Sequence, residues 1–139
     1  MKTVFLDTNV IIDFFQKREE FYDAAALIIN LANEGKIKII VSSLTFVTAY
    51  YILKKIYSKE DLVKCLSGLA DLCIISDVSS MNIKNALHSD FKDFEDCVQI
   101  KSSVNVKSEV IISRNVKDFV NSPIPVKTPI EFLSEFFGR

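Results

Sequence analysis

Residues 3–15 read TVFLDTNVIIDFF, an apolar run that is interrupted once, by Asp7, Thr8 and Asn9. Residues 3–6 have the length and apolar character of a core strand, and the apolar residues that resume near Val10 begin a helix. A carboxylate is an unusual neighbour for core residues, because burial disfavours its charged form. Asp7 therefore marks either the cap of a helix or the first residue of a functional site.

Short β-branched runs alternate with helical patterns along the rest of the chain. We expect strands at residues 3–6, 37–41, 72–75, 110–113 and 124–126, because each run is too short for a helix. Helical spacing fills residues 21–32 and 62–70, and Thr128 and Pro129 start a last helix that runs to Phe137. Strands that are apolar throughout indicate a parallel sheet covered on both faces. The expected fold class is α/β, a three-layer α/β/α domain with a central parallel sheet of about four or five strands.

The composition excludes several classes of protein. A chain of 139 residues with 49% apolar side chains suits one domain, which we expect to span residues 1–139. No apolar stretch approaches the roughly 18 residues of a membrane span, and no signal-peptide pattern is present, so we expect a soluble, cytoplasmic protein without a membrane partner. A net charge of −1 excludes the basic field of a duplex-binding protein. Cys65, Cys73 and Cys97 are scattered and have only His88 as an imidazole partner, so we expect reduced thiols and no zinc site.

Polar residues gather where the expected strands end. Ligands bind outside the carboxyl ends of parallel strands, and right-handed crossovers could bring distant segments to that edge. Several carboxylates at one edge repel one another, and a hard divalent cation such as Mg²⁺ or Mn²⁺ is the simplest compensation. The residues concerned are Asp7, Ser42 and Ser43, the acids Asp93, Glu95 and Asp96, and the group Ser113, Arg114, Asn115 and Asp118.

A purely structural interpretation of the same acids stays open. Asp7, Thr8 and Asn9 are all good helix caps. Asp93 and Asp96 have the spacing of a cap and its third-position acid, and Asp118 alone would be a solvated loop residue.

Four segments, in this order, resemble the PIN domain family: FLDTNVIIDFF, SSLTFVTAYYILKK, DFEDCVQIKSS and SRNVKDF. The resemblance covers essentially the whole chain, including the final TPIEFL helix. It implies the fold of metal-dependent nucleases that occur as the toxin halves of bacterial toxin–antitoxin pairs.

The resemblance also implies an activity, the metal-dependent hydrolysis of phosphodiester bonds in single-stranded RNA. Asp7, Asp96 and Asp118 match the family's ligands for Mg²⁺ or Mn²⁺. Asn115 joins them in the catalytic set, as the partner of Asp118 in the polar pair after the fourth strand. The accessory candidates are Asp93, Glu95, Thr8, Asn9, Thr45, Thr48 and Arg114.

One position departs from the family pattern. Thr48 stands where typical members carry a glutamate in the helix after the second strand, and threonine is a much poorer metal ligand. Either Glu95 or Asp93 makes up the charge, or the metal is held weakly, or the domain is no longer a nuclease. The alternative function is therefore a PIN-like module that binds RNA or protein without catalysis. A phosphatase or receiver-like α/β domain also places aspartates at strand ends and forms a third alternative.

Two features bear on partners. Residues 44–53, LTFVTAYYIL, are apolar around most of a helix, more than one buried face requires. We expect a homodimer, with an antitoxin protein as a further partner; a helix buried wholly within its own domain is the alternative. An RNA substrate needs cations beside an acidic pocket, and those available are Lys54, Lys55, Lys59, Lys101, Lys107, Arg114 and Lys117.

Overall fold

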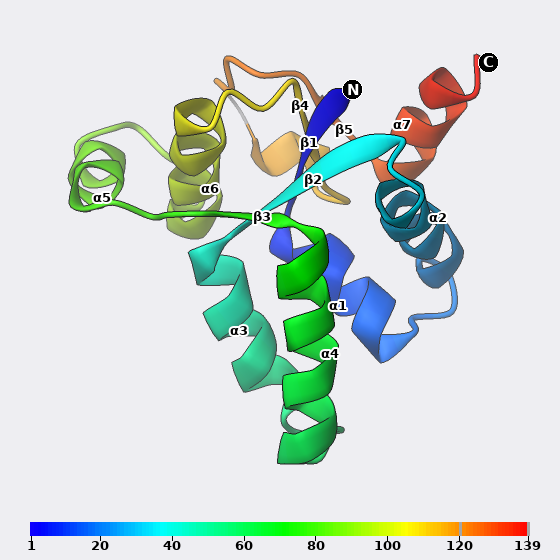
Figure 1. Cartoon of the computed structure of the whole chain (residues 1–139). Helices are drawn as coiled ribbons and strands as arrows, with labels where there is room; N and C mark the ends of the chain where they lie inside the picture. The colour runs from blue at the N-terminus through cyan, green and yellow to red at the C-terminus, as the bar shows by residue number, and fades with distance from the viewer. Residues whose placement is uncertain (120, 139) are drawn as a thin grey trace.

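A computed structural model describes residues 1–119 and 121–138 (Figure 1). Strands and helices alternate along most of the chain, as the sequence predicts. In chain order the elements are β1 (Lys2–Leu6), α1 (Thr8–Gln16), α2 (Tyr22–Asn33), β2 (Ile37–Ser42), α3 (Ser43–Leu53), α4 (Lys59–Leu72), β3 (Ile74–Ser76), α5 (Ser80–Leu87), α6 (Phe94–Asn105), β4 (Val110–Ile112), the 3-10 turn η1 (Val116–Asp118), β5 (Val126–Lys127) and α7 (Pro129–Phe136).

The strands described form one parallel sheet in the order β3-β2-β1-β4-β5. β1 occupies the centre, where Phe5 lies opposite Ile40 on β2 and Ile111 on β4. Because all these strands run in one direction, their carboxyl ends share an edge, and Asp7 lies at the middle of it. The prediction of a central parallel sheet of about four or five strands is confirmed, with five strands in the described chain.

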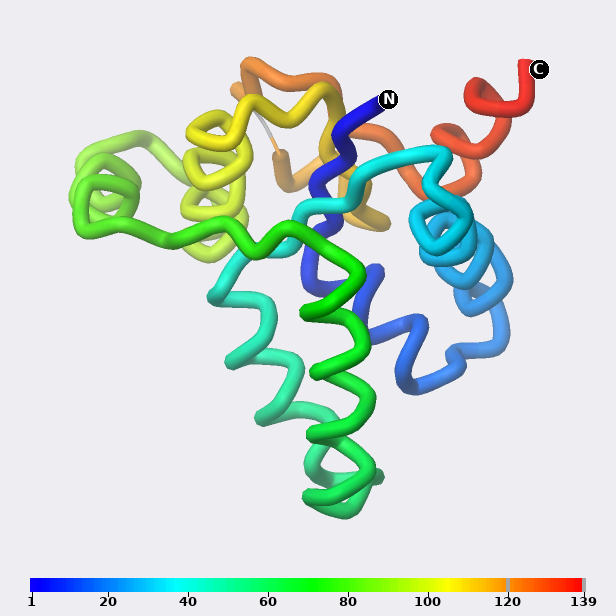
Figure 2. The backbone as a smooth tube through the Cα atoms, in the orientation of Figure 1, coloured from blue at the N-terminus to red at the C-terminus, as the bar shows by residue number. Residues whose placement is uncertain are grey.

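Both faces of the sheet are covered. Val4 and Leu6 point into a large apolar cluster with α1, α2, α3, α4 and α7, whereas Phe5 joins Ile111 and Phe119 in a smaller cluster under α6. Figure 2 shows α5 and α6 grouped apart from the helices that cover the other face. This alternation makes β1 apolar at every core position, and the three-layer α/β/α prediction is confirmed.

Two predicted strands were misplaced, the third and the fifth. Leu72 ends α4 and Cys73 is its cap, so the third strand is β3, Ile74–Ser76, and not residues 72–75. β3 is also an edge strand with two exposed isoleucines, unlike the buried strand that we expected. The fifth strand is Val126–Lys127 rather than residues 124–126, because Pro125 has no N–H to donate to the sheet.

Side-chain caps start several helices. Asp7 and Asp93 accept backbone N–H groups at the starts of α1 and α6, so the capping interpretation is correct for both. Thr128 caps α7, which ends at Phe136, one residue earlier than expected, and His88 is the C-cap of α5. The three cysteines are free thiols. Each helix of the described chain is too short or too polar to span a bilayer.

Candidate functional site

An open cavity of about 360 Å³ lies at the carboxyl edge of the sheet, between α1, α3, the start of α6 and the segment after β4. The tertiary structure brings together acids that lie far apart in the sequence. The predicted residues that line the cavity are Asp7, Thr8, Asn9, Thr48, Asp93, Glu95, Asp96, Arg114, Asn115 and Asp118.

Asp7 is the most buried acid of the cavity, with only 4% of its surface exposed. Its Oδ1 accepts the backbone N–H of Thr8 at 2.9 Å and the side-chain amide of Gln99 at 3.4 Å. Its Oδ2 accepts the hydroxyl of Ser113 at 2.8 Å and the amide of Asn9 at 3.3 Å. A carboxylate offers about four acceptor positions, so the protein alone holds this side chain in one orientation.

Gln99 contacts the residues of the site and was not predicted from the sequence. Its side chain is fully buried, accepts the hydroxyl of Ser42 at 2.6 Å and donates to Thr45 at 3.0 Å. The same amide reaches Thr8 at 3.3 Å and Asp7 at 3.4 Å. Gln99 therefore ties α6 to the ends of β1 and β2.

A weak signal for Gln99 was present in the sequence. It lies three residues after Asp96 in FEDCVQ, and this spacing places two polar side chains on one face of the same helix. An amide on the face that packs on a sheet needs buried hydrogen-bond partners. The sequence could not show which residues are these partners, because that depends on how α6 packs across the end of β2.

Burial and mutual repulsion raise the pKa values of three acids of the cavity, Asp7, Glu95 and Asp96. Burial is the main cause for Asp7, whose pKa is raised even though hydrogen bonds from Ser113, Thr8 and Gln99 oppose the shift. The pKa of Asp96 is raised to about 7, first by burial and then by the charges of Asp7, Asp93, Asp118 and Glu95.

Glu95 shares this environment. Its pKa is raised by burial and by the charges of Asp7 and Asp93. The Thr8 hydroxyl donates to Glu95 at 3.5 Å, the long end of the hydrogen-bond range. The cavity therefore disfavours further negative charge and favours a cation.

The remaining acids have partners of their own. Asp93 accepts the N–H of Asp96 at 3.0 Å as the cap of α6. Asp118 lies 3.4 Å from the ammonium of Lys92, a cation that the sequence analysis did not single out. Asn115 is exposed, and its backbone N–H donates to Ser113.

Arg114 binds a buried carboxylate rather than pointing freely into the cavity. Its Nε lies 2.5 Å and a terminal nitrogen 3.2 Å from the two oxygens of Asp13, which is almost fully buried. The guanidinium also stacks 4.1 Å from the ring centroid of Phe21. Arg18, which was not predicted, lines the cavity as well and lies 3.8 Å from Asp13. Among the described residues these two arginines are the cations of the lining, and the predicted lysines lie elsewhere.

The two threonine candidates differ in position. Thr45 is fully buried and does not line the cavity. Its hydroxyl forms hydrogen bonds with the Thr8 hydroxyl at 2.8 Å and with the Gln99 amide at 3.0 Å. Thr48 lines the cavity, and its hydroxyl makes no hydrogen bond within the described chain. Thr45 can therefore position other residues, whereas Thr48 can reach a ligand.

The donor set suits a hard divalent cation, because Mg²⁺ and Mn²⁺ prefer carboxylate and water oxygens. Within residues 1–119 and 121–138, however, no three His, Cys, Asp or Glu side chains already converge closely enough to hold an ion. One of the acids, Asp118, has its carboxylate 3.4 Å from the ammonium group of Lys92, and this contact competes with a metal ion for the same oxygen.

Comparisons with known proteins agree with this geometry. A family model described as PIN domain matches residues 3–117. Ribonuclease VapC1 of Aquifex aeolicus is 33% identical, over 93% of this chain and 92% of that protein.

Two solved structures share the fold. A toxin-antitoxin complex from Klebsiella pneumoniae matches with a TM-score of 0.65 and 24% identity, over 91% of this chain and 97% of that chain. VapC20 of Mycobacterium tuberculosis, described as a sarcin-ricin loop cleaving toxin, matches with a TM-score of 0.61 and 12% identity, over 78% of this chain and 86% of that chain. Since the family model covers most of its length, the chain belongs to the PIN domain family.

Proposed function

We propose that the chain is a metal-dependent endoribonuclease that hydrolyses phosphodiester bonds in single-stranded RNA. The observation that carries the proposal is the gathering of Asp7, Glu95, Asp96 and Asp118 around one cavity, with the pKa of Asp96 raised to about 7. A bound cation would relieve that repulsion. The 33% identity to a protein named as a ribonuclease supports the choice of RNA as substrate.

Asp7, Asp96 and Asp118 would hold Mg²⁺ or Mn²⁺, which when bound supplies Lewis-acid activation of the phosphate and of a water molecule. Four hydrogen bonds hold Asp7 in place before any ligand arrives. Asp118 would give up its contact with Lys92 to hold the cation, and Asn115, which lines the same cavity, would orient a phosphate oxygen or water.

The threonine in place of a family glutamate does not leave the cavity short of charge. Thr48 lines the cavity with a hydroxyl that has no hydrogen-bond partner among residues 1–119 and 121–138, which suits a water molecule or phosphate oxygen. Glu95 lines the same cavity and supplies a carboxylate from α6. We therefore favour an active enzyme over the binding module that lacks catalysis.

Incubation of single-stranded RNA with the protein and Mg²⁺, Mn²⁺ or EDTA tests the proposal. Cleavage should require the metal and should disappear in Asp7→Asn. Asp71→Asn is the matched control, because Asp71 is exposed on α4, far from the cavity lining in sequence and absent from it. Equal cleavage by wild type and Asp7→Asn would contradict the proposal, and metal-independent RNA binding without cleavage would favour the binding module.

We further propose that α3 contacts a second copy of the chain. Val47 and Tyr51 are 70% and 63% exposed, and Val47 borders an apolar hollow of about 400 Å³ together with Leu44, Ile83 and Phe94. Val47→Asp and Tyr51→Asp should convert a dimer into a monomer in light scattering after size exclusion. Val63→Asp, on the exposed face of α4, is the control. A wild type that is already monomeric contradicts the proposal.

The toxin role is inferred from relatives that are named in toxin–antitoxin complexes. We propose that this chain pairs with an antitoxin and acts on RNA in the cytoplasm. Expression of the wild type should arrest growth, Asp7→Asn should not, and co-expression of an adjacent small reading frame should restore growth. Unimpaired growth with the wild type alone would argue against a toxin.

A further inference from the structure

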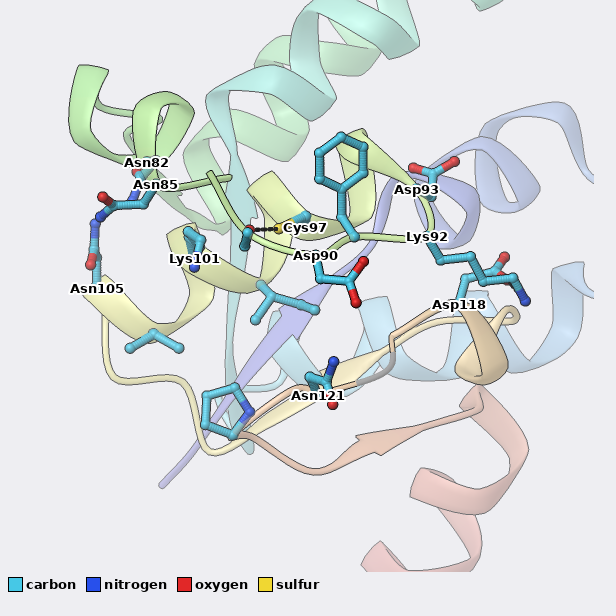
Figure 3. A pocket seen from close by; sticks show the side chains of 15 residues that line it. Asn82, Asn85, Asp90, Lys92, Asp93, Cys97, Lys101, Asn105, Asp118 and Asn121 are labelled. Carbon is cyan, nitrogen blue, oxygen red and sulfur yellow. Dashed lines mark hydrogen bonds and ion pairs between the residues drawn. The ribbon is translucent and has the colours of Figure 1, made fainter. Parts of the chain in front are cut away.

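A second cavity, of about 460 Å³, adjoins the acidic cavity and shares Asp93 and Asp118 with it. Figure 3 shows Lys92, Asp93 and Asp118 at one end and Asn82, Asn85 and Asn105 gathered at the other. The size falls within the range of about 300–1,000 Å³ that is typical of small-ligand sites. A ligand could therefore extend from the acidic cavity into this one.

The far end of the second cavity offers unused hydrogen-bonding groups. Asn85 and Asn105 line it from α5 and α6, and Asn121 lines its lower side in Figure 3. The side-chain amides of these three residues make no hydrogen bond within the described part of the chain. Each amide carries both a donor and an acceptor, which is the pattern needed to read the edge of a nucleobase.

The cavity also offers an aromatic surface. Phe91 lines it and is 38% exposed, and its ring forms an edge-to-face pair with Phe94, with 5.4 Å between the ring centroids. Ile100 and Val104 of α6 add apolar surface. Unpaired bases stack on exposed aromatic rings of this kind.

The charges of the lining select the part of a nucleotide that enters. Lys92 and Lys101 face three acids, Asp90, Asp93 and Asp118, so the cavity as a whole does not attract a phosphate group. A neutral base avoids this repulsion, and its phosphate would lie at the boundary with the acidic cavity, where the cation of the proposed function would offset the charges of the acids. Lys101 has no ion-pair partner in the described chain and remains available to the sugar–phosphate backbone.

We propose that this cavity is a base-binding subsite for one unpaired nucleotide next to the scissile phosphate. The inference rests on the proposed ribonuclease function and adds a reason for single-stranded substrates, since a paired base could not enter. Phe91 provides the stacking surface, and Asn85 and Asn105 contact the edge of the base. A protein segment of similar size is the rival occupant, and the test separates the two.

Binding is measured in the Asp7→Asn background, which removes cleavage from the measurement. Fluorescence anisotropy with a labelled short single-stranded RNA in Mg²⁺ gives Kd for Phe91→Ala and for the double variant Asn85→Ala/Asn105→Ala. We expect the loss of stacking in Phe91→Ala to weaken binding at least about fivefold. Asn30→Ala and Lys64→Ala, at exposed positions of α2 and α4, are matched controls that should leave Kd unchanged. Thermal melts confirm that each variant is folded.

Kd values that stay unchanged in folded subsite variants would overturn the inference. So would an equal loss of affinity for duplex RNA, because the site would then hold the sugar–phosphate backbone and not a base. These outcomes are distinct from failure of the proposed function. If wild type never cleaves RNA with any metal but the subsite variants still bind RNA more weakly, the enzyme proposal fails and the subsite stands.

Discussion

Asp7 serves as a helix cap and as the most buried acid of the cavity at the same time. The two roles are compatible because the cap uses one acceptor position of Oδ1, toward Thr8. Ser113 and Asn9 then fix Oδ2. The local role and the proposed catalytic role thus depend on the same orientation of one carboxylate.

Asp7→Asn should raise the melting temperature in metal-free buffer. The pKa of Asp7 is raised, mainly by burial, so the folded protein disfavours its charged form. A neutral amide of the same shape removes that penalty, at the cost of the acceptor oxygen that takes the Ser113 hydroxyl and the Asn9 amide. Thermal melts at about pH 8 should show the increase, with Asp71→Asn unchanged. A lower melting temperature for Asp7→Asn would show that the hydrogen bonds outweigh the charge.

Gln99→Leu should destabilise the fold by about 2 kcal/mol or more, because buried hydroxyls would lose their partner. Ser42 and Thr45 would be the groups most affected, at 2.6 and 3.0 Å from the present amide. Urea unfolding measures the change, and Asn30→Leu, at an exposed position, should cost far less. A loss of stability no larger than that of the control would mean that these hydroxyls find other partners.

At the scale of elements, Arg114 joins the segment after β4 to α1. Two hydrogen bonds to Asp13 and stacking on Phe21 hold its side chain. Arg114 therefore fixes the position of the segment after β4 relative to α1, and both line the cavity. We interpret Arg114 as a structural ion-pair partner rather than a phosphate ligand. The wall from α1 also carries Thr8 and Asn9, so a shift here would displace groups that contact Asp7.

Arg114→Ala should lower the free energy of unfolding by about 3 kcal/mol, because it leaves a buried carboxylate without its main partner. Arg114→Lys should recover part of the loss, and Arg18→Ala should cost less, since Arg18 lies 3.8 Å from Asp13 and is about half exposed. Chemical denaturation measures all three variants. A stable Arg114→Ala that binds RNA poorly would instead assign Arg114 to the substrate.

At the scale of the molecule, the acidic edge links stability to pH. The pKa values of Asp7, Glu95 and Asp96 are all raised in the folded state. Folded protein therefore binds these protons more tightly than unfolded protein does, and stability falls as the protons are lost. For Asp96 the window runs from its ordinary pKa of 3.8 to the folded value of about 7.

Metal-free protein should thus melt at a lower temperature at about pH 8 than at about pH 5, because Asp7, Glu95 and Asp96 lose protons that the folded state binds more tightly. Mg²⁺ should raise the melting temperature mainly at the higher pH, because the ligands must be deprotonated to bind. Asp96→Asn should flatten the pH dependence. An equal effect of Mg²⁺ at both pH values would mean that the ion binds elsewhere.

The sequence by itself determined the parallel α/β architecture, since strands with no polar face can be buried only between two layers of helices. It also determined which acids follow strand ends, because Asp7 interrupts an apolar run that is otherwise unbroken. Boundaries failed where the pattern was continuous, as at Leu72, where helix and strand are apolar alike.

Only the tertiary structure decided the partners of these acids. Gln99 reaches Asp7 across 92 positions of sequence, and Arg114 reaches Asp13 across 101. Local spacing cannot predict such pairs, because each depends on where two separately formed elements cross the sheet. For the same reason, the structure and not the sequence placed Arg18 in the acidic cavity and brought Asn85 of α5 near Asn105 of α6 at the far end of the second cavity.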